Sequence, residues 1–368
     1  MGRKSSKLFV GMDVHKESID IAVAEEGGEA RHHGRIGGDL NALGGAVRKL
    51  ESLGRPLVFV YEAGPCGYGI YRMLKARRHE CWVVSPSNTP RRVRDRIKTD
   101  RRDSLKLAGL ARAGELTPIY VPDQADEAMR DLVRTREDAV AMQRQARHRL
   151  SALLLRNDIR YAGKTAWTAG HRRWISRLSL PSAPQRIAFE EYVQAVEEAT
   201  DRVGRLTQAI EQELIDWRWQ PVAAALQACR GIQLIHAARI VAELGDLARF
   251  SHPRELMAYL GLIPSEDSSG DRRRQGAITK AGNSSARRAM VEAAWAYQHP
   301  AAVSPVIARR QTGLPKAAID IAWKAQLRLC ARFRRLGARG LNRNKIAVAI
   351  ARELAGFVWA IGQQVKPS

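Results

Sequence analysis

The side chains that could perform chemistry begin with two carboxylates at the ends of apolar runs. Asp13 follows LFVGM, where apolar and smaller residues alternate, and Glu62 closes the continuous apolar run PLVFVYE. The first pattern predicts a half-buried strand, and the second predicts a strand buried on both faces. A carboxylate at a strand end is held rigidly enough to bind a catalytic metal. Asp13 by itself is more simply explained as a loop-capping residue after an ordinary first strand, and its companion carboxylates change that balance.

Two further carboxylates lie in the segment KTDRRD. Thr99 can cap a helix whose first turn holds Asp100 and Asp103, three residues apart and therefore on one face. Because carboxylates in a first turn also suit the helix dipole, a solvated pair of helix acids is the alternative. Four oxygen-rich ligands from two strand ends and one helix are what two Mg²⁺ ions need to straddle a scissile phosphate. We therefore predict one magnesium site formed by Asp13, Glu62, Asp100 and Asp103.

The elements that must position these carboxylates follow the order of a ribonuclease H fold. Three strands in a meander come first, and helices then alternate with strands. In that fold the fourth strand lies parallel beside the first, which would bring Glu62 next to Asp13. The predicted strands cover 7–14, 18–24, 30–36, 56–62 and 80–85, and the predicted helices cover 40–53, 69–78 and 99–112.

The charge of the chain indicates a polyanionic partner. Its 61 Lys and Arg against 38 Asp and Glu give a net charge of +23 over 368 residues. The excess is concentrated, with 17 basic and 3 acidic residues over 270–345 and 9 basic and 3 acidic over 91–112. Two basic surfaces and nucleic acid as the partner are the simplest interpretation.

Other classes of protein are disfavoured by what the sequence lacks. No apolar run approaches the 18 residues of a membrane span, and MGRKSSK leads into a strand without a signal-peptide core, so we expect no membrane and a cytoplasmic location. The four cysteines include no Cys-x-x-Cys pair, which argues against a zinc ribbon or a disulfide framework.

The rest of the chain is predicted to be mainly helical. Segments 123–155 and 188–217 have helical or near-heptad spacing, which predicts an antiparallel pair, an oligomerising coiled coil or a plain spacer. Segment 227–250 is predicted to hold two helices around Gly231, resembling a helix-hairpin-helix that offers amides to a phosphate. The Ser, Gly and Arg of 264–287 predict a phosphate-binding loop before a helix, and 287–362 is predicted to be helical and basic.

These motifs together resemble the DEDD insertion-sequence transposases, the "IS one-ten" family of bridge-RNA-guided serine recombinases. The resemblance covers nearly the whole chain. It rests on GMDVHK, YEAGPCGYG, KTDRRD, RGIQLIHAARIVAELGD and GLIPSEDSSG followed by GAITKAGNSSARR. Two departures are Ser104, where alanine is expected, and Gln233, where a glycine is usual. The second departure lies in the turn of the hairpin that would contact a phosphate.

The resemblance implies an architecture and an activity. It implies an α/β domain of the ribonuclease H and RuvC type over 1–122, a helical coiled-coil linker or oligomerisation region over 123–217, and a mainly α-helical C-terminal transposase domain over 218–368. The activity is transposition: an insertion-sequence recombinase cuts and rejoins strands between donor and target DNA, guided by a structured non-coding bridge RNA. We expect a dimer or tetramer with active sites shared between subunits.

The resemblance also selects a nucleophile. A recombinase must conserve the energy of the broken phosphodiester, and a serine ester does so where water would not. Among the serines of this region the resemblance falls on Ser269, directly before Gly270, although a turn cap or a simple phosphate contact remains the alternative. The expected nucleic-acid contacts are the basic residues Arg91, Arg92, Arg94, Arg101, Arg102, Arg272, Arg273, Arg274, Lys280, Arg287 and Arg288.

Three other readings fit part of the sequence. A Holliday-junction nuclease of the RuvC type would share the four carboxylates but needs no second basic domain. A sugar kinase or actin-like ATPase would require small residues after Asp13, where His15 and Lys16 occur. A catalytically inactive nucleic-acid-binding scaffold would retain the basic surfaces, and a Mg²⁺ requirement for cleavage distinguishes it from an enzyme.

Overall fold

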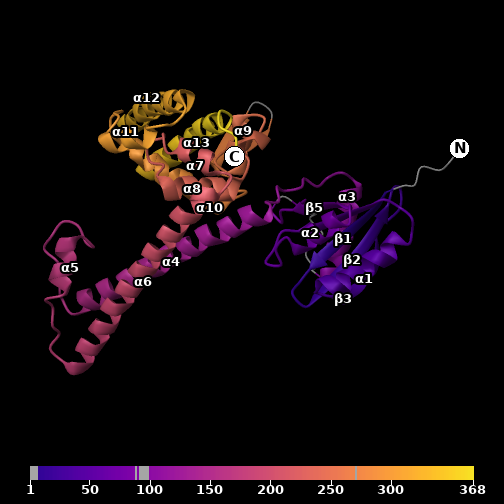
Figure 1. Cartoon of the computed structure of the whole chain (residues 1–368), viewed down its shortest axis with the longest axis horizontal. Coiled ribbons are helices and arrows are strands. Elements are labelled where there is room, and N and C mark those ends of the chain that lie inside the picture. The colour runs from indigo at the N-terminus through magenta and orange to yellow at the C-terminus, as the bar shows by residue number, and fades with distance from the viewer. Residues whose placement is uncertain (1–6, 88, 91–98, 270–271) are drawn as a thin grey trace. The chain divides into compact units, whose positions relative to one another are not determined.

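The computed structural model describes residues 7–87, 89–90, 99–269 and 272–368, and the side chains of 267–275 lie outside that description. The chain divides into two compact units, Met1–Pro122 and Asp123–Ser368, which are described one at a time (Figure 1). The first unit is mixed α/β and the second is mostly helical. No helix in the described part of the chain is long and apolar enough to cross a bilayer.

The first unit is built on a five-stranded sheet with the order β3-β2-β1-β4-β5. β1 pairs antiparallel with β2, and β2 pairs antiparallel with β3. β4 pairs parallel with β1, and β5 pairs parallel with β4. The predicted parallel pairing of the fourth strand with the first is therefore confirmed. The strands are β1 (Leu8–Val14), β2 (Ser18–Glu25), β3 (Arg31–Gly37), β4 (Leu57–Glu62) and β5 (Glu80–Val84).

Helices cover both faces of this sheet. Alternate residues of the strands pack with α1 and α2 on one face, and the residues between them pack with α3 on the other. The central strands are apolar on both sides for this reason, and only their ends can carry charge. The helices are α1 (Leu40–Glu51), α2 (Gly69–Ala76) and α3 (Asp100–Arg112).

Helix α3 lies unusually close to β1. A Cβ atom added at Gly11 would lie 2.3 Å from the Ser104 carbonyl oxygen and 2.4 Å from the Ala108 amide nitrogen, so only glycine permits this approach. The Thr99 hydroxyl accepts a hydrogen bond from the Arg102 amide, which fixes the start of the helix as the sequence predicts. The first turn of α3 is thereby held near the end of β1.

The second unit begins with two long helices that pack against each other. Helices α4 (Gln124–Arg156) and α6 (Ala183–Asp216) run antiparallel, and α5 (Ala169–Ile175) lies at their far end (Figure 1). Polar contacts join the middle of the pair, where Arg136 Nε donates to Thr207 Oγ1 at 2.7 Å and Gln143 Nε2 donates to Thr200 Oγ1 at 3.0 Å. Separate apolar clusters lie on either side of this polar stretch.

The remainder of the second unit is a bundle of helices with one small sheet. Its core includes the buried faces of α7, α8, α10, α12 and α13. The helices are α7 (Gln220–Leu226), α8 (Leu234–Leu244), η1 (Leu247–Arg249), α9 (Pro253–Tyr259), α10 (Ser284–Ala294), η2 (Trp295–Gln298), α11 (Pro305–Gln311), α12 (Lys316–Ala338) and α13 (Arg343–Gly362).

Two local predictions for this unit are wrong. The bounds of segment 227–250 are wrong: two helices flank Gly231 as predicted, but α7 already ends at Leu226, so α8 is the one α-helix inside the segment. Gly231 has a φ of 83°, and its Cα faces the Ala293 carbonyl too closely for any side chain, so packing explains this glycine. The predicted loop over 264–287 instead contains antiparallel β6 (Pro264–Ser269) and β7 (Arg272–Ile278), where ladder hydrogen bonds satisfy a backbone whose polar composition favours a loop.

Candidate active site

The end of β1 presents Asp13 beside a histidine and a second carboxylate. His15 Nε2 lies 3.2 Å from Asp13 Oδ2 and 3.6 Å from Asp100 Oδ1. One ligand atom from each of the three residues lies within 4.8 Å of the others. Asp13 comes from the strand and Asp100 from the first turn of α3, so the cluster depends on the close approach at Gly11.

Electrostatics at this cluster favour a bound cation. The pKa of Asp13 is raised above its ordinary value, first because burial penalises the carboxylate and also because Asp103 and Asp100 repel it. The His15 ring opposes both effects through its hydrogen bond and charge. The contacts with His15 do not fully offset the cost of burying the Asp13 carboxylate among other carboxylates. A divalent cation with carboxylate ligands fits such a donor set.

The other two predicted ligands lie around this cluster. Tyr61 of β4 pairs with Met12 of β1, so Glu62 and Asp13 are the next residues on two neighbouring parallel strands. Met12 and Tyr61 pack on the α1 and α2 face, and alternation therefore directs Glu62 and Asp13 to the face that α3 covers. Within the described residues, neither Glu62 nor Asp103 belongs to the group of atoms within 4.8 Å of one another.

Sequence reasoning missed two residues of this site. It considered His15 only as an argument against a phosphate loop, although a histidine two residues after a strand-end aspartate can turn back toward it. Arg35 of β3 was also missed: its Nη2 lies 3.7 Å from Asp100 Oδ2 and its Nε lies 3.6 Å from Asp20 Oδ2. Arg35 could have been assigned to the site only from the register of β2 with β3, which places it opposite Asp20.

The predicted serine and basic residues are described unevenly. Ser269 is the last residue of β6, but its side chain and those of Arg272, Arg273 and Arg274 lie outside the described residues. The same holds for all of Arg91, Arg92 and Arg94.

The remaining basic residues are within the description. Arg101 and Arg102 are exposed on the first turn of α3, and Lys280 and Arg288 are exposed in the second unit. Arg287 differs, since its Nη1 donates to the carbonyl oxygens of Leu260 and Ala281 at 2.9 Å each. Arg287 therefore stabilises the fold, in addition to its predicted contact with nucleic acid.

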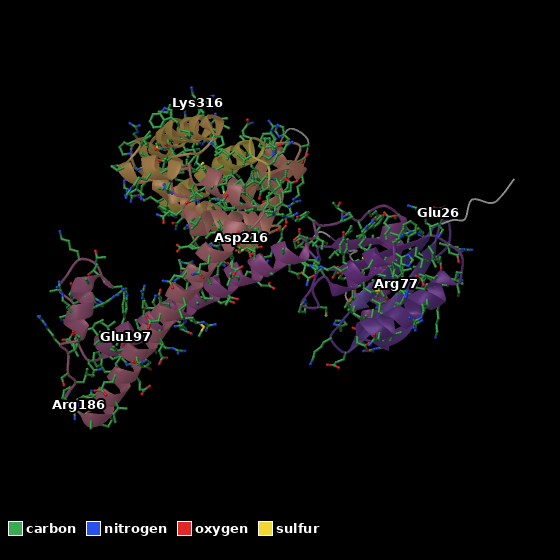
Figure 2. All side chains as sticks on the ribbon, in the orientation of Figure 1. Glu26, Arg77, Arg186, Glu197, Asp216 and Lys316 are labelled. Atoms are coloured by element: carbon green, nitrogen blue, oxygen red, sulfur yellow. The ribbon has the colours of Figure 1, made fainter. Side chains whose placement is uncertain are left out.

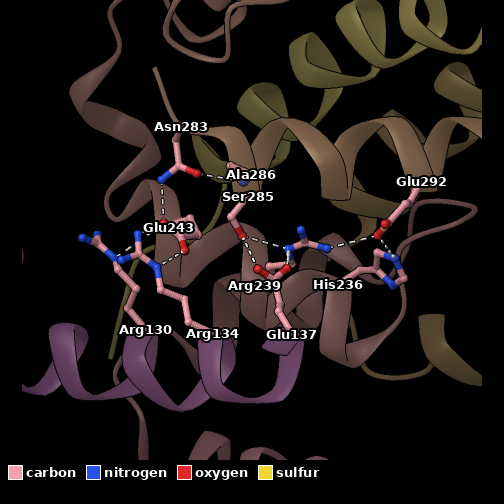
Figure 3. Close-up of polar contacts among 10 residues, drawn as sticks. All are labelled: Arg130, Arg134, Glu137, His236, Arg239, Glu243, Asn283, Ser285, Ala286 and Glu292. Atoms are coloured by element: carbon pink, nitrogen blue, oxygen red, sulfur yellow. Dashed lines mark hydrogen bonds and ion pairs between the residues drawn. The ribbon is translucent and has the colours of Figure 1, made fainter. Parts of the chain in front are cut away.

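A second polar cluster lies between α4, α8 and α10 and was not predicted (Figure 3). Glu243 is fully buried and accepts a bidentate pair of hydrogen bonds from Arg134 at 2.7 and 2.8 Å, and a third from Asn283 Nδ2 at 2.6 Å. Burial acts to raise the pKa of Glu243, but those hydrogen bonds and the charges of Arg134 and Arg130 lower it overall. Glu243 is thus a buried carboxylate whose charge is balanced by its arginine and asparagine partners.

The same cluster continues along α8. Arg239 contacts Glu137 of α4, Ser285 Oγ at 3.0 Å and Glu292 Oε2 at 3.1 Å. Ser285, one of the serines near the predicted nucleophile, donates to Glu137 Oε2 at 2.9 Å and is therefore held in this network. A sequence signal existed, since His236, Arg239 and Glu243 recur at helical spacing in the otherwise apolar LIHAARIVAEL.

A mixed five-stranded sheet with a carboxylate cluster at a strand end, followed by a basic and mostly helical unit, is compatible with a DEDD transposase. Comparison with known proteins agrees. Residues 223–304 match the family described as "Transposase IS116/IS110/IS902 family", and residues 10–157 match a second transposase family of the DEDD type.

Full-length relatives extend this match. The y4qE protein of Sinorhizobium fredii is 42% identical over 362 residues, which is 98% of this chain and 90% of the relative. The transposase for insertion sequence element IS1533 of Leptospira borgpetersenii is 30% identical over 338 residues, which is 90% of this chain and 96% of the relative. The transposase for insertion sequence element IS1111A of Coxiella burnetii is 23% identical over 376 residues, covering 98% and 91%. The chain belongs to the IS110 family of insertion-sequence transposases.

Proposed function

We propose that this transposase is a bridge-RNA-guided recombinase that cuts and rejoins DNA with a magnesium site in its first unit and a serine nucleophile in its second. The observation that carries the proposal is the cluster of Asp13, His15 and Asp100, whose ligand atoms lie within 4.8 Å of one another. The raised pKa of Asp13 supports it, because a cation would offset the cost of burying the carboxylate and also the repulsion from Asp103 and Asp100.

The ligands we assign to Mg²⁺ are Asp13, Glu62, Asp100 and Asp103, in a RuvC-like domain. When bound, the cation supplies Lewis-acid polarisation of the scissile phosphate. The protein itself orients the carboxylates, through the end of β1 and the capped first turn of α3. His15 is a positioning residue here: its ring, 3.2 Å from Asp13 Oδ2, restrains that carboxylate.

Ser269 is the proposed nucleophile. Its hydroxyl oxygen would form a bond to phosphorus while the bond from phosphorus to the leaving deoxyribose oxygen breaks, and the serine proton would leave to that oxygen or to solvent. Rejoining reverses the exchange with a different deoxyribose hydroxyl, so no external energy is needed. The arginines at 272–274 support the proposal, because their charges suit a phosphorane.

Trapping the reaction under denaturing conditions tests the nucleophile. Wild-type protein should carry covalently bound DNA, Ser269→Ala should carry none, and the matched control Ser268→Ala should carry as much as wild type. An adduct that maps to another residue, or recombination without any adduct, would overturn the assignment.

The guide RNA and the assembly are tested separately. We expect a structured non-coding RNA to copurify with the protein and a dimer or tetramer to form with active sites shared between subunits. Sequencing of the copurified RNA tests the guide. Mixing Asp13→Ala with Ser269→Ala subunits tests the shared sites, since only composite sites would regain activity in the mixture. A protein that recombines DNA after complete RNA removal would exclude guidance by RNA.

A further inference from the structure

A basic surface lies at the far end of the long helix pair. It is formed by residues outside the two basic segments of the sequence, 91–112 and 270–345. We call residues 144–186 the hairpin tip; it comprises the end of α4, α5, the start of α6 and the loops between them (Figure 2). These residues include ten Lys and Arg and a single acid, Asp158. The hairpin tip thus holds a positive excess of nine within a net charge of +23.

Most of these cations are exposed and have no carboxylate partner. Arg160 pairs with Asp158 at 3.1 Å, and Arg186 donates to the carbonyl oxygens of Leu180 and Pro181. Throughout the hairpin tip, which the structure describes completely, no other ion pair to these side chains forms. The exposed cations without one are Arg144, Arg149, Arg156, Lys164, Arg172, Arg173, Arg177 and Arg186.

Folding does not explain this charge. The interior of the hairpin tip is an apolar cluster that includes Leu150, Leu154, Ile175 and Leu180, and the adjacent Phe189 of α6 completes it. Unpaired like charges on one small element repel each other and cost stability, so their presence indicates a polyanionic ligand.

Aromatic rings accompany the charge. Tyr161, Trp167 and Trp174 surround His171, with ring centroids 4.7, 5.1 and 5.4 Å from its own. Trp167 has a φ of 66°, a left-handed conformation that is rare for a bulky side chain. The Arg147 guanidinium lies 5.1 Å from the centre of its ring, and Arg147 Nε is buried without a hydrogen-bond partner.

A cavity of about 280 Å³ opens beside Trp167. Its walls include the apolar side chains of Leu150, Ile175, Val193 and Val196. Its charged groups are two arginines, Arg147 and Arg172, and two acids, Glu197 and Asp201, and the hydroxyl residues Ser176 and Thr200 also line it. The volume is just below the range of about 300–1,000 Å³ for drug-sized ligands, which suits a smaller planar group. Carboxylates accept hydrogen bonds from the amino groups of bases, and arginine attracts phosphate.

We propose that the hairpin tip binds single-stranded nucleic acid, with the backbone on its exposed arginines and one unpaired base in the cavity beside Trp167. This combination of a basic surface with a stacking platform is how proteins bind unpaired strands. The ligand is an unpaired stretch of RNA or of DNA, two sources that share this chemistry. The inference rests on the proposed function, because a DNA recombinase directed by RNA handles both kinds of strand.

A symmetric contact between two hairpin tips is the competing use of this surface. The residues of each tip carry an excess of nine positive charges, and the adjacent α6 acids Glu190, Glu191, Glu197 and Glu198 leave an excess of five over 144–199, so two tips brought together would still repel. A polyanion between them would be required in any case, which favours nucleic acid as the direct ligand.

Removing charge tests the backbone contact in the full-length protein. The triple variant Arg172→Gln, Arg173→Gln, Arg177→Gln should bind a single-stranded oligonucleotide at least about tenfold more weakly near physiological salt, and its plot of log K against log salt should flatten by about two units at 0.7 per lost phosphate contact. The matched control Arg48→Gln, Lys49→Gln, Lys75→Gln removes three exposed cations from the first unit and should change neither quantity. Equal losses in both variants would overturn the proposal.

The base contact is tested without altering the fold. Wild-type protein should bind a cytosine oligonucleotide, whose bases carry an amino group, about tenfold more tightly than an abasic strand of equal charge, since stacking on one aromatic contributes about 1–3 kcal/mol. Trp167→Ala should abolish that preference and Trp167→Phe should retain most of it. A fully paired duplex that binds as tightly as the single strand, or a preference that survives in Trp167→Ala, would overturn the proposal.

The same preparations separate this inference from the proposed function. RNA and DNA oligonucleotides of one sequence identify the source of the strand. If wild-type protein neither binds nucleic acid nor cleaves DNA, the proposed function fails. If it binds and cleaves, and the tip variants behave as wild type, only the hairpin-tip inference fails.

Discussion

Asp13 and Glu243 are both carboxylates largely withdrawn from water, and their pKa values shift in opposite directions. At Asp13 burial raises the pKa most, His15 at 3.2 Å opposes it, and Asp103 and Asp100 add a smaller repulsion, so the pKa stays above its ordinary value. At Glu243 two arginines and an asparagine outweigh the effect of burial. A buried carboxylate whose neighbours do not offset the cost of burial is suited to a cation, and one whose neighbours more than offset that cost contributes to the fold.

The largest expected effect tests the first half of this comparison. Asp13→Ala should lower strand cleavage by on the order of 1,000-fold, because losing a ligand removes several kcal/mol of transition-state stabilisation. The circular dichroism spectrum should stay unchanged. Glu26→Gln alters an exposed carboxylate of the same unit and is the matched control. Wild-type rates for Asp13→Ala, measured by gel assay of a cleaved strand, would show that the cluster is not catalytic.

The second half of the comparison predicts a stability effect at Glu243. Glu243→Gln should reduce the free energy of unfolding by about 3 kcal/mol, the lower end for breaking a buried pair, because Arg134 is half exposed and regains water. Urea titration measures the loss, and Glu190→Gln on the exposed face of α6 should change little.

The pH dependence of this stabilisation has a definite sign. The folded pKa of Glu243 lies below its ordinary value of 4.5. Its contribution is therefore complete above pH 4.5 and declines as the pH falls below that value, because the unfolded chain takes up the proton first. A difference between wild type and Glu243→Gln that grows on acidification would contradict the assignment.

A smaller effect is expected at Gly11, where β1, which carries Asp13, packs against α3, which carries Asp100. Gly11→Ala should cost about 1–3 kcal/mol of stability, because the new methyl group would overlap the backbone of α3. It should also reduce cleavage, because the methyl group would displace α3 and so move Asp100 away from Asp13. Gly109→Ala, in the same helix with nothing within 4 Å of the new Cβ, should be neutral or stabilising by up to about 1 kcal/mol. Similar thermal shifts for both variants would show that the close approach is unimportant.

The smallest effect is a gain in stability. The raised pKa of Asp13 means that the folded state binds the proton more tightly, so Asp13 reduces stability as the pH rises above its ordinary value of 3.8. In metal-free protein, Asp13→Asn should raise the melting temperature slightly at neutral pH and leave it unchanged near pH 3. A lower melting temperature at pH 7 would place Asp13 with Glu243 as a structural carboxylate.

Much of the first unit was predictable because its signals are local. Alternation along Leu8–Val14, the apolar run up to Glu62 and the Thr99 cap each act within a few residues, and the structure contains the corresponding elements. The parallel pairing of β4 with β1 followed from the order of elements. The partnership of His15 with Asp100 could not be predicted in the same way, because it depends on how closely α3 approaches β1.

The second unit was less predictable for a physical reason. Glu243 and Arg134 are separated by 109 positions and meet only through the packing of α8 on α4. The β6 and β7 hairpin was missed because its Ser, Asp and Arg residues have turn or surface preferences, and backbone pairing overrides them. The short α7 before Gln227 was missed for the opposite reason, since its alanines fit several assignments equally well.

The polar stretch in the middle of the α4 and α6 pair is a place where the helix pair could be lengthened without disturbing its apolar packing. Arg136 with Thr207 and Gln143 with Thr200 separate the apolar cluster of the bundle from that of the hairpin tip. Seven residues inserted into each helix there would keep the facing sides in register and lengthen the pair by about 10 Å without opening either core. The helix pair is thus an adjustable spacer, and relatives could vary its length to span different distances with the same two ends.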